Sequence, residues 1–281
     1  FRSADRGGSW TSANQGLTDP FVLCLTTGKD GAIYAGTFRG GVFRSRDGGK
    51  IWQPVNKGLK RLEIKALMMD AKGLYAGTGD GVYLLNAAQD QWKVVSTGLD
   101  EILVHALART DDGTLYAGTS GKGVHSYKER STGWTRLRQG LRDHEGLVEN
   151  FIRVLAVDKE QGVYAGTFDG GVFRSGDAGK TWSPISRALP NDSIRGLISN
   201  ERGVYVATGR GIFKTVDKGR QWVPLNKGLS NLSVQVLIEG EKGGFYAGTS
   251  SGVFRSDDDG LTWTAVSQGL EGESVAPFKF N

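Results

Sequence analysis

The sequence is poor in several residue types that would point to other classes of protein. Its one cysteine, Cys24, cannot form an internal disulfide, and three histidines are few for a metal site built from imidazoles. No apolar stretch approaches the roughly eighteen residues that a membrane-spanning helix needs. Proline is also rare, with 6 residues against 43 glycines, which indicates many tight turns rather than disordered linkers. These absences favour a globular fold without a membrane span, metal or cofactor.

The charge of the chain is mildly basic, with a net charge of +5. Such a charge is compatible with an acidic partner. Nucleic-acid-binding surfaces carry denser clusters of Lys and Arg, interleaved with aromatic residues, so nucleic acid is a disfavoured partner. The chain begins with Phe1 rather than Met, and no basic-apolar signal segment is present. We therefore expect it to be processed or cut from a longer protein.

Helical periodicity is absent, and the sequence instead repeats a short β-rich unit. The motif YAGT, or its variant VATG, is followed each time by a run such as GVFRS or GVYLL. The copies occupy residues 34–37, 75–78, 116–119, 164–167, 206–209 and 246–249. A tryptophan follows every run, and residues 1–10 supply the end of one more unit. The tryptophans are Trp10, Trp52, Trp92, Trp134, Trp182, Trp222 and Trp263.

The spacing of the repeat predicts an all-β fold, a seven-bladed β-propeller with four-stranded antiparallel blades. Each tryptophan is followed twelve residues later by another apolar run, except that the interval after Trp134 is eighteen. A unit of about 42 residues with four short strands is typical of one blade. Seven tryptophans predict seven blades in a single domain, residues 1–281.

The terminal blade would be shared by the two ends of the chain, residues 1–14 and 274–281, whose strands close the ring. Together these segments are too short for four strands. The missing strand would be absent, replaced by the C-terminal tail, or part of a removed portion of a larger protein.

The turn before most tryptophans carries the pattern S/T-x-D-x-G-x-x-W. Five copies are complete, with the aspartates Asp5, Asp47, Asp177, Asp217 and Asp258. In such a hairpin the Asp accepts hydrogen bonds from turn N–H groups, the Gly takes a positive φ, and the Trp covers the turn. Catalytic aspartates are the alternative, but repetition around a ring favours a structural role. The run 257–259 is interpreted in the same way, because it lacks the ligand spacing of a calcium loop.

The repeat, for example YAGTFDGGVFRSGDAGKTW at 164–182, resembles the BNR/Asp-box superfamily of β-propellers over essentially the whole chain. Members of that superfamily include sialidases, xyloglucanases, sortilin-type receptors and the photosystem II assembly/stability factors. The even repeats and short loops are most similar to propellers of the photosystem-factor type. That resemblance implies non-catalytic protein binding and an extracytoplasmic location, whether periplasmic, lumenal or secreted. It is specific for fold and weak for function, since these relatives share blades rather than active sites.

A partner-binding surface is predicted at one mouth of the central channel. There, the loops joining the blades and the loops between second and third strands share one face. The second residue of successive first strands places Lys65, His105, Arg153 and Arg195 at this mouth. The loops on the same face add Arg39, Lys122, Arg210, His144, Phe38 and Phe168. Clustered positive charge at such a mouth attracts carboxylates, phosphates or an acidic protein surface. The alternative is that these side chains only cap strand ends in solvent.

We expect a scaffold for protein binding or assembly rather than an enzyme. The alternative is a glycoside hydrolase or carbohydrate-binding propeller of the sialidase or xyloglucanase type. A glycosidase needs two carboxyl groups about 5 to 9.5 Å apart. The anionic rim residues Asp80 and Asp169 lie two blades apart in the repeat. The F/Y-R-I-P signature of sialidases is also absent, because residues 1–3 read as an ordinary third strand.

Overall fold

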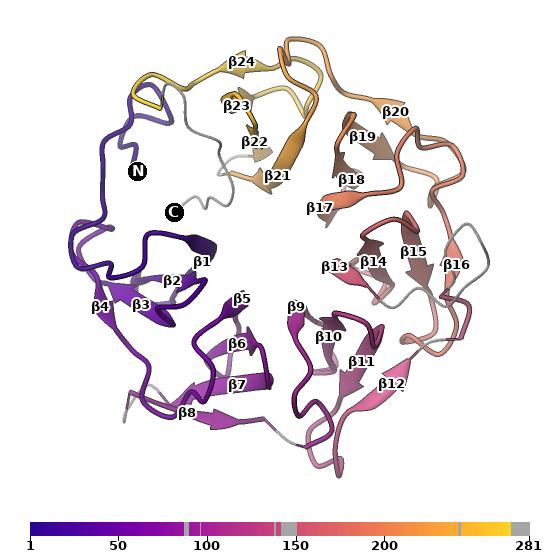
Figure 1. Ribbon diagram of the computed structural model, residues 1–281. Coiled ribbons are helices and arrows are strands. Elements are labelled where there is room, and N and C mark those ends of the chain that lie inside the picture. The colour runs from indigo at the N-terminus through magenta and orange to yellow at the C-terminus, as the bar shows by residue number, and fades with distance from the viewer. Residues whose placement is uncertain (87–89, 96, 138, 142–150, 241–242, 271–281) are drawn as a thin grey trace.

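The structure is a computed structural model that describes residues 1–86, 90–95, 97–137, 139–141, 151–240 and 243–270. These residues form six four-stranded antiparallel sheets around a common axis, as Figure 1 shows. Within each sheet the strands follow one another in sequence order, so every sheet is a simple meander. The all-β propeller with four-stranded blades is therefore confirmed, and the described residues form six blades.

The innermost strand of each blade is the first in sequence and the outermost is the fourth (Figure 1). The first three blades are β1 (Val22–Thr27), β2 (Ile33–Thr37), β3 (Val42–Ser45), β4 (Gln53–Pro54); β5 (Ile64–Met69), β6 (Leu74–Thr78), β7 (Gly81–Asn86), β8 (Gln91–Val94); and β9 (Val104–Arg109), β10 (Leu115–Thr119), β11 (Val124–Tyr127), β12 (Thr135–Leu137). The last three are β13 (Ile152–Val157), β14 (Val163–Thr167), β15 (Val172–Ser175), β16 (Ser183–Pro184); β17 (Ile194–Asn200), β18 (Gly203–Thr208), β19 (Gly211–Thr215), β20 (Val223–Pro224); and β21 (Val234–Glu239), β22 (Phe245–Thr249), β23 (Gly252–Ser256), β24 (Thr264–Ala265).

The prediction of seven blades is wrong. Among the described residues, the N-terminal unit that contains Trp10 forms an isolated bridge between Arg2 and Thr11 and no sheet, and it lies in the sector between the β1 and β21 blades (Figure 1). Trp10 nevertheless contacts the last blade, which precedes its unit around the ring, because its indole N–H donates to the carbonyl of Val266 at 2.8 Å. Each tryptophan therefore marks a contact between two units, and the number of tryptophans does not give the number of sheets. The predicted contribution of residues 274–281 falls outside the described residues.

The YAGT motif packs one blade against the next. In β14, Ala165 and Thr167 have no exposed surface, and the Thr167 hydroxyl donates to the carbonyl of Gly171 at 2.9 Å in the following turn. Gly166 admits Ile194 of the next blade, since a Cβ at this glycine would lie 2.6 Å from Ile194 Cγ2. The apolar core thus lies between neighbouring sheets, where the motif allows their backbones to approach closely.

Each tryptophan ties its blade to the preceding unit. The indole N–H of Trp92 donates to the carbonyl of Val55 at 2.7 Å, and its backbone N–H donates to that of Lys57 at 2.8 Å. The adjacent Gly58 has a φ of 97°, and a Cβ there would lie 2.3 Å from the Trp92 carbonyl oxygen. All seven tryptophans donate at least one such bond, through the indole, the backbone N–H or both. We call this arrangement the tryptophan contact.

One tryptophan contact shows why the glycine is needed. The position equivalent to Gly58 in the fourth blade is Ala188, which does not adopt a positive φ. Within the described residues, the backbone N–H of Trp222 makes no bond to this segment. The indole N–H of Trp222 still donates to the carbonyl of Ile185 at 2.8 Å. Replacing the glycine therefore coincides with the loss of one of the two hydrogen bonds.

The S/T-x-D-x-G-x-x-W turn is held by its aspartate. The Asp47 carboxylate accepts a hydrogen bond from the Ser45 hydroxyl at 2.7 Å and from the N–H groups of Lys50 and Ile51, both at 3.0 Å. Gly49 has a φ of 89°, and its N–H donates to Ser45 Oγ at 2.8 Å. The other four complete copies bind the backbone N–H groups of Ser9, Thr181, Gln221 and Thr262. Hydroxyl and backbone hydrogen bonds hold the pKa of Asp5, Asp177 and Asp258 at about 2.

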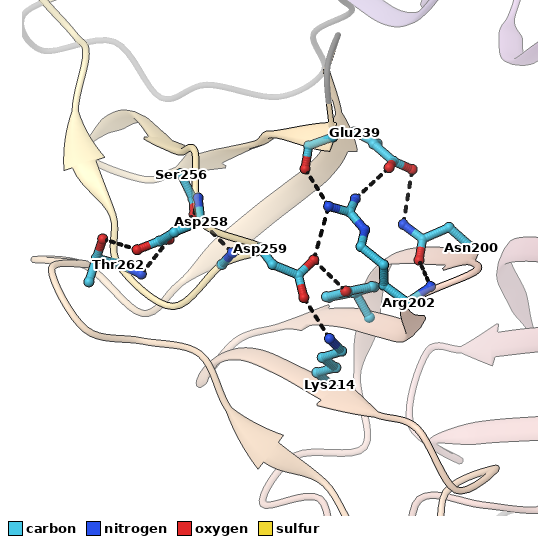
Figure 2. A network of polar contacts seen from close by, with 11 residues as sticks. Asn200, Arg202, Lys214, Glu239, Ser256, Asp258, Asp259 and Thr262 are labelled. Atoms are coloured by element: carbon cyan, nitrogen blue, oxygen red, sulfur yellow. Dashed lines mark hydrogen bonds and ion pairs between the residues drawn. The ribbon is translucent and has the colours of Figure 1, made fainter.

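Ion pairs add further links between the last two blades, as Figure 2 shows. Asp259 accepts hydrogen bonds from Lys214 Nζ and the Tyr205 hydroxyl, both at 2.6 Å. Arg202 pairs with Glu239 at 2.6 Å and with Asp259 at 3.2 Å. The carboxylates of residues 257–259 all accept hydrogen bonds from groups of the protein itself. No group of three potential metal ligands occurs in the described part of the chain.

A glycine substitution tests the tryptophan contact. Gly58→Ala would combine an unfavourable positive φ with a clash against the Trp92 carbonyl, whereas Gly31→Ala shares only the φ of 77° and meets no atom within 4 Å. We expect Gly31→Ala to lower the free energy of unfolding by about 1 kcal/mol and Gly58→Ala by at least about 3 kcal/mol. Urea denaturation of both variants measures the difference. Equal losses would show that the close approach at Trp92 is not important for stability.

Candidate functional site

The four predicted rim residues on innermost strands, Lys65, His105, Arg153 and Arg195, occupy one structurally distinct position, the β-bulge of the strand. In the blade β5–β8, Ile64 pairs with Thr78 and Ala66 with Gly77, which leaves Lys65 outside the ladder. The same shift occurs in the other five blades at Leu23, His105, Arg153, Arg195 and Gln235. A bulge re-aims the side chain of its extra residue. Six bulges at one level therefore present a ring of side chains around the start of the innermost strands.

Four of these bulge residues, together with two phenylalanines, form a contiguous surface that we call the rim band. Its members are Lys65, His105, Phe151, Arg153, Phe168 and Arg195. The His105 ring lies 5.4 Å from the Phe151 ring, and Phe151 lies 5.7 Å from Phe168, between ring centroids. The Arg153 guanidinium lies over the Phe168 ring, 4.8 Å from its centroid. Phe168 is 49% exposed, so the band offers apolar as well as charged surface.

The two arginines of the rim band carry positive charge that no carboxylate of the described residues neutralises. Arg153 donates to Ser193 Oγ at 3.3 Å, and Arg195 donates to Ser233 Oγ at 3.1 Å. Neither forms an ion pair within the described residues. Burial lowers the pKa of Arg153 below its usual value, and the positive charge of Arg195 lowers it further. The serine hydroxyls thus orient two mutually repelling cations without compensating their charge.

His105 is enclosed between charged neighbours. Its Nε2 atom is buried and has no hydrogen-bond partner in the described structure. Burial lowers the pKa of His105 below its ordinary value of 6.5, and the positive charges of Lys65 and Arg153 lower it further, while Glu63 opposes them. His105 is therefore neutral at pH 7. Protonation of His105 at more acidic pH would add a further positive charge to the band.

Three predicted site residues lie apart from the rim band. Lys122 and Arg210 are exposed and make no hydrogen bond or ion pair with it in the described part of the chain. Arg39 lies in the turn between β2 and β3 of the first blade, with its guanidinium 5.1 Å from the Phe38 ring centroid. The Lys65 ammonium lies 5.2 Å from the same ring, which joins Phe38 to one end of the band. His144 lies outside the described residues.

Sequence reasoning missed several residues of this face. Phe151 and Phe21 immediately precede innermost strands, and their carbonyls accept hydrogen bonds from Phe168 at 3.1 Å and Phe38 at 2.9 Å. Glu63 precedes Lys65 and pairs with it at 2.9 Å. An aromatic residue before the apolar run of a first strand is the one signal that would have identified the two phenylalanines.

Two described carboxylates of this face, those of Asp19 and Asp80, are engaged in local hydrogen bonds. Asp19 accepts from the N–H groups of Phe21 and Gly40, both at 3.0 Å, and Asp80 accepts from the hydroxyls of Thr78 and Tyr83, both at 2.8 Å. Among the described residues, every carboxyl with a shifted pKa is shifted downward. A general acid of a glycosidase requires the opposite shift.

The sequence matches no protein-family model and no curated protein. Solved structures match it in fold. The extracellular domain of the putative hybrid two component system BT3049 from B. thetaiotaomicron has a TM-score of 0.76 and 18% identity, over 89% of this chain and 34% of that chain. The GH74 xyloglucanase from Xanthomonas campestris has a TM-score of 0.70 and 18% identity, over 92% and 46%. The computationally designed Ika8 protein has a TM-score of 0.62 and 18% identity, over 92% and 78%.

The chain shares the β-propeller fold of these proteins. It spans less than half the length of the first two. At this level of identity the likeness extends to the fold and not to the site. Within the described residues, the structure contains no helix with the length and apolar character needed to cross a bilayer.

The charge environment of His105 leads to a testable titration. Removing a neighbouring cation stabilises the imidazolium, so Lys65→Gln should raise the pKa of His105 toward 6.5. The ring signals of His105, followed by NMR across the acid range, measure this pKa. Lys180→Gln, on the opposite face, is the matched control and should leave the pKa unchanged. A His105 pKa that does not respond to Lys65→Gln would contradict the arrangement.

Proposed function

We propose that this chain is a non-catalytic scaffold that binds the acidic surface of a protein partner through the rim band. The observation that carries the proposal is the pair of arginines, Arg153 and Arg195, on adjacent bulges, where each is oriented by a serine hydroxyl and neither pairs with a carboxylate among the described residues. An approaching carboxylate would relieve their mutual repulsion and would form charge-assisted hydrogen bonds with guanidinium donors that are already oriented.

The aromatic part of the rim band supports a protein partner over a simple anion. Phe168 and Phe151 are 49% and 38% exposed, and they lie beside the cations rather than apart from them. Aromatic residues and arginine are the types enriched at the centres of protein interfaces. A partner that combines acidic and apolar side chains would therefore match both components of the band.

The absence of catalysis is part of the proposal. On the rim face, Asp19, Glu63 and Asp80 already accept hydrogen bonds or ion pairs from neighbouring groups. A carboxylate that neighbouring donors already engage is less available to act as an acid or nucleophile. The resemblance to photosystem-factor-type propellers favours the same interpretation, and with it an extracytoplasmic location.

Carbohydrate binding is the second candidate, and the exposed phenylalanines favour it. Phe21 is 69% exposed and Phe168 is 49% exposed on the same face, and flat aromatic surfaces suit sugar rings. One of the fold neighbours is a GH74 xyloglucanase. A neutral sugar would leave the Arg153 and Arg195 charges uncompensated, which is why an acidic protein surface is the preferred ligand.

A charge reversal tests the rim band. Labelled poly-L-glutamate should bind the chain at low salt and should be released as salt increases, because screening weakens exposed charge interactions. Lys65→Glu combined with Arg153→Glu should weaken this binding by about 10-fold or more in fluorescence anisotropy. Lys180→Glu combined with Arg220→Glu makes the same change in net charge on the opposite face and should have little effect. Unaltered binding by the first double variant would show that the rim band is not the site.

Incubation with xyloglucan and with a chromogenic sialoside tests the non-catalytic interpretation. We expect no release of reducing ends or chromophore above that of a heat-denatured sample. Reproducible hydrolysis that is lost on replacing Asp80 or Asp169 with Asn would overturn the scaffold proposal and establish the glycosidase alternative.

A further inference from the structure

A hollow lies on the rim face at the seam between the first and second blades. It has a volume of about 350 Å³ and is lined by Phe38, Arg39, Arg61, Leu62, Glu63 and Gly79. Phe38 and Leu62 supply its apolar surface and are 36% and 39% exposed. Its size is at the lower end of the roughly 300–1,000 Å³ typical of ligand pockets. The hollow is therefore large enough for one or two side chains.

The hollow carries net positive charge. Its one carboxylate, Glu63, is neutralised by Lys65 at 2.9 Å. The Arg39 guanidinium lies over the Phe38 ring, where it faces the apolar surface. Neither Arg39 nor Arg61 forms an ion pair within the described residues. Two arginines thus line the hollow beside its apolar side chains, and neither is paired with a carboxylate of the described residues.

The walls of the hollow are held in place by backbone hydrogen bonds. The Asp19 carboxylate accepts from the N–H groups of Arg39 at 2.5 Å and Gly40 at 3.0 Å, which fixes the turn after β2. The N–H of Gly41 donates to the carbonyl of Leu62 at 3.0 Å, which ties this turn to the segment that enters β5. A ligand would therefore bind a preformed site and would lose little free energy in ordering it.

From this combination we infer that the hollow is an anchor for an acidic segment of the protein partner, in which a carboxylate side chain is adjacent to an apolar side chain. The apolar side chain packs on Phe38 and Leu62, while the carboxylate binds Arg39 and Arg61. Charge complementarity selects an acidic segment over a neutral or basic one. The inference rests on the proposed function and specifies the part of the partner that docks at the first seam, next to the Lys65 end of the rim band.

Blocked tetrapeptides test the anchor. The probe contains aspartate followed by phenylalanine between terminal glycines, and two matched peptides replace the aspartate with asparagine or the phenylalanine with serine. Titration calorimetry and saturation-transfer NMR with the folded chain should show binding of the first peptide and weaker binding of the other two. Either replacement should weaken binding by about 10-fold, because each removes a charge-assisted hydrogen bond or the packed ring.

Two variants locate the binding. Arg61→Gln should weaken binding of the aspartate-phenylalanine peptide by about 10-fold, whereas Arg220→Gln, on the opposite face, should not. Gly79→Leu should fill the hollow and abolish binding. Gly79 does not have a positive φ, and the nearest atom to a Cβ there is Arg61 Cγ at 3.8 Å, so the chain should fold normally. Thermal denaturation confirms the folding of each variant.

The outcomes separate the anchor from the proposed function. Loss of peptide binding in Arg61→Gln and Gly79→Leu, with poly-L-glutamate binding retained, supports the anchor. Failure of the peptide to bind, or binding that both variants leave unchanged, overturns it. In that case poly-L-glutamate binding that still depends on Lys65 and Arg153 leaves the proposed function intact.

Discussion

The propeller depends on the hydrogen bonds that each tryptophan donates to the unit before it. Trp92 shows the complete arrangement, with an indole bond to Val55, a backbone bond to Lys57, and Gly58 at a positive φ where a side chain would collide with the tryptophan carbonyl. The same contact closes the ring, since Trp10 binds the last blade and Trp52 binds the N-terminal segment at the carbonyl of Ala13. Stacked units of this kind gain stability mainly from the interfaces with their neighbours. Because these contacts set the spacing of the blades, they also set the spacing of the bulge residues that form the rim band.

Repetition made most of the fold predictable from the sequence. The YAGT runs, the glycine-rich turns and the even spacing of tryptophans all pointed to four-stranded blades around an axis, and the six sheets agree with that interpretation. The number of blades was not predictable in this way. A tryptophan marks a hairpin and a contact between units. Trp10 provides both, although its unit forms no sheet among the described residues, where its strand pairing is the isolated Arg2–Thr11 bridge. Whether a unit completes its sheet depends on long-range pairing, which local sequence does not reveal.

The candidate site was predictable in position but not in geometry. Reading the second residue of each innermost strand placed Lys65, His105, Arg153 and Arg195 at one level, and the structure shows that all four are bulge residues. A bulge is a property of register between strands, so the alternation of side chains along one strand cannot disclose it. The pairing of Glu63 with Lys65 and the stacking of Phe151 between His105 and Phe168 likewise arise from neighbouring loops and blades. Among the described residues, these contacts divide the rim into an end where Lys65 is paired with Glu63 and an end where Arg153 and Arg195 have no carboxylate partner.

Hydrogen exchange of the tryptophan backbone amides, in a sample labelled with ¹⁵N-tryptophan, tests the contact between units most directly. The backbone N–H groups of Trp92, Trp182 and Trp263 donate to the preceding unit, whereas that of Trp222, opposite Ala188, does not, although all four side chains are buried. The account predicts slow exchange for the first three amides and markedly faster exchange for Trp222. Equal protection of all four, or fast exchange at Trp92 and Trp263, would contradict it.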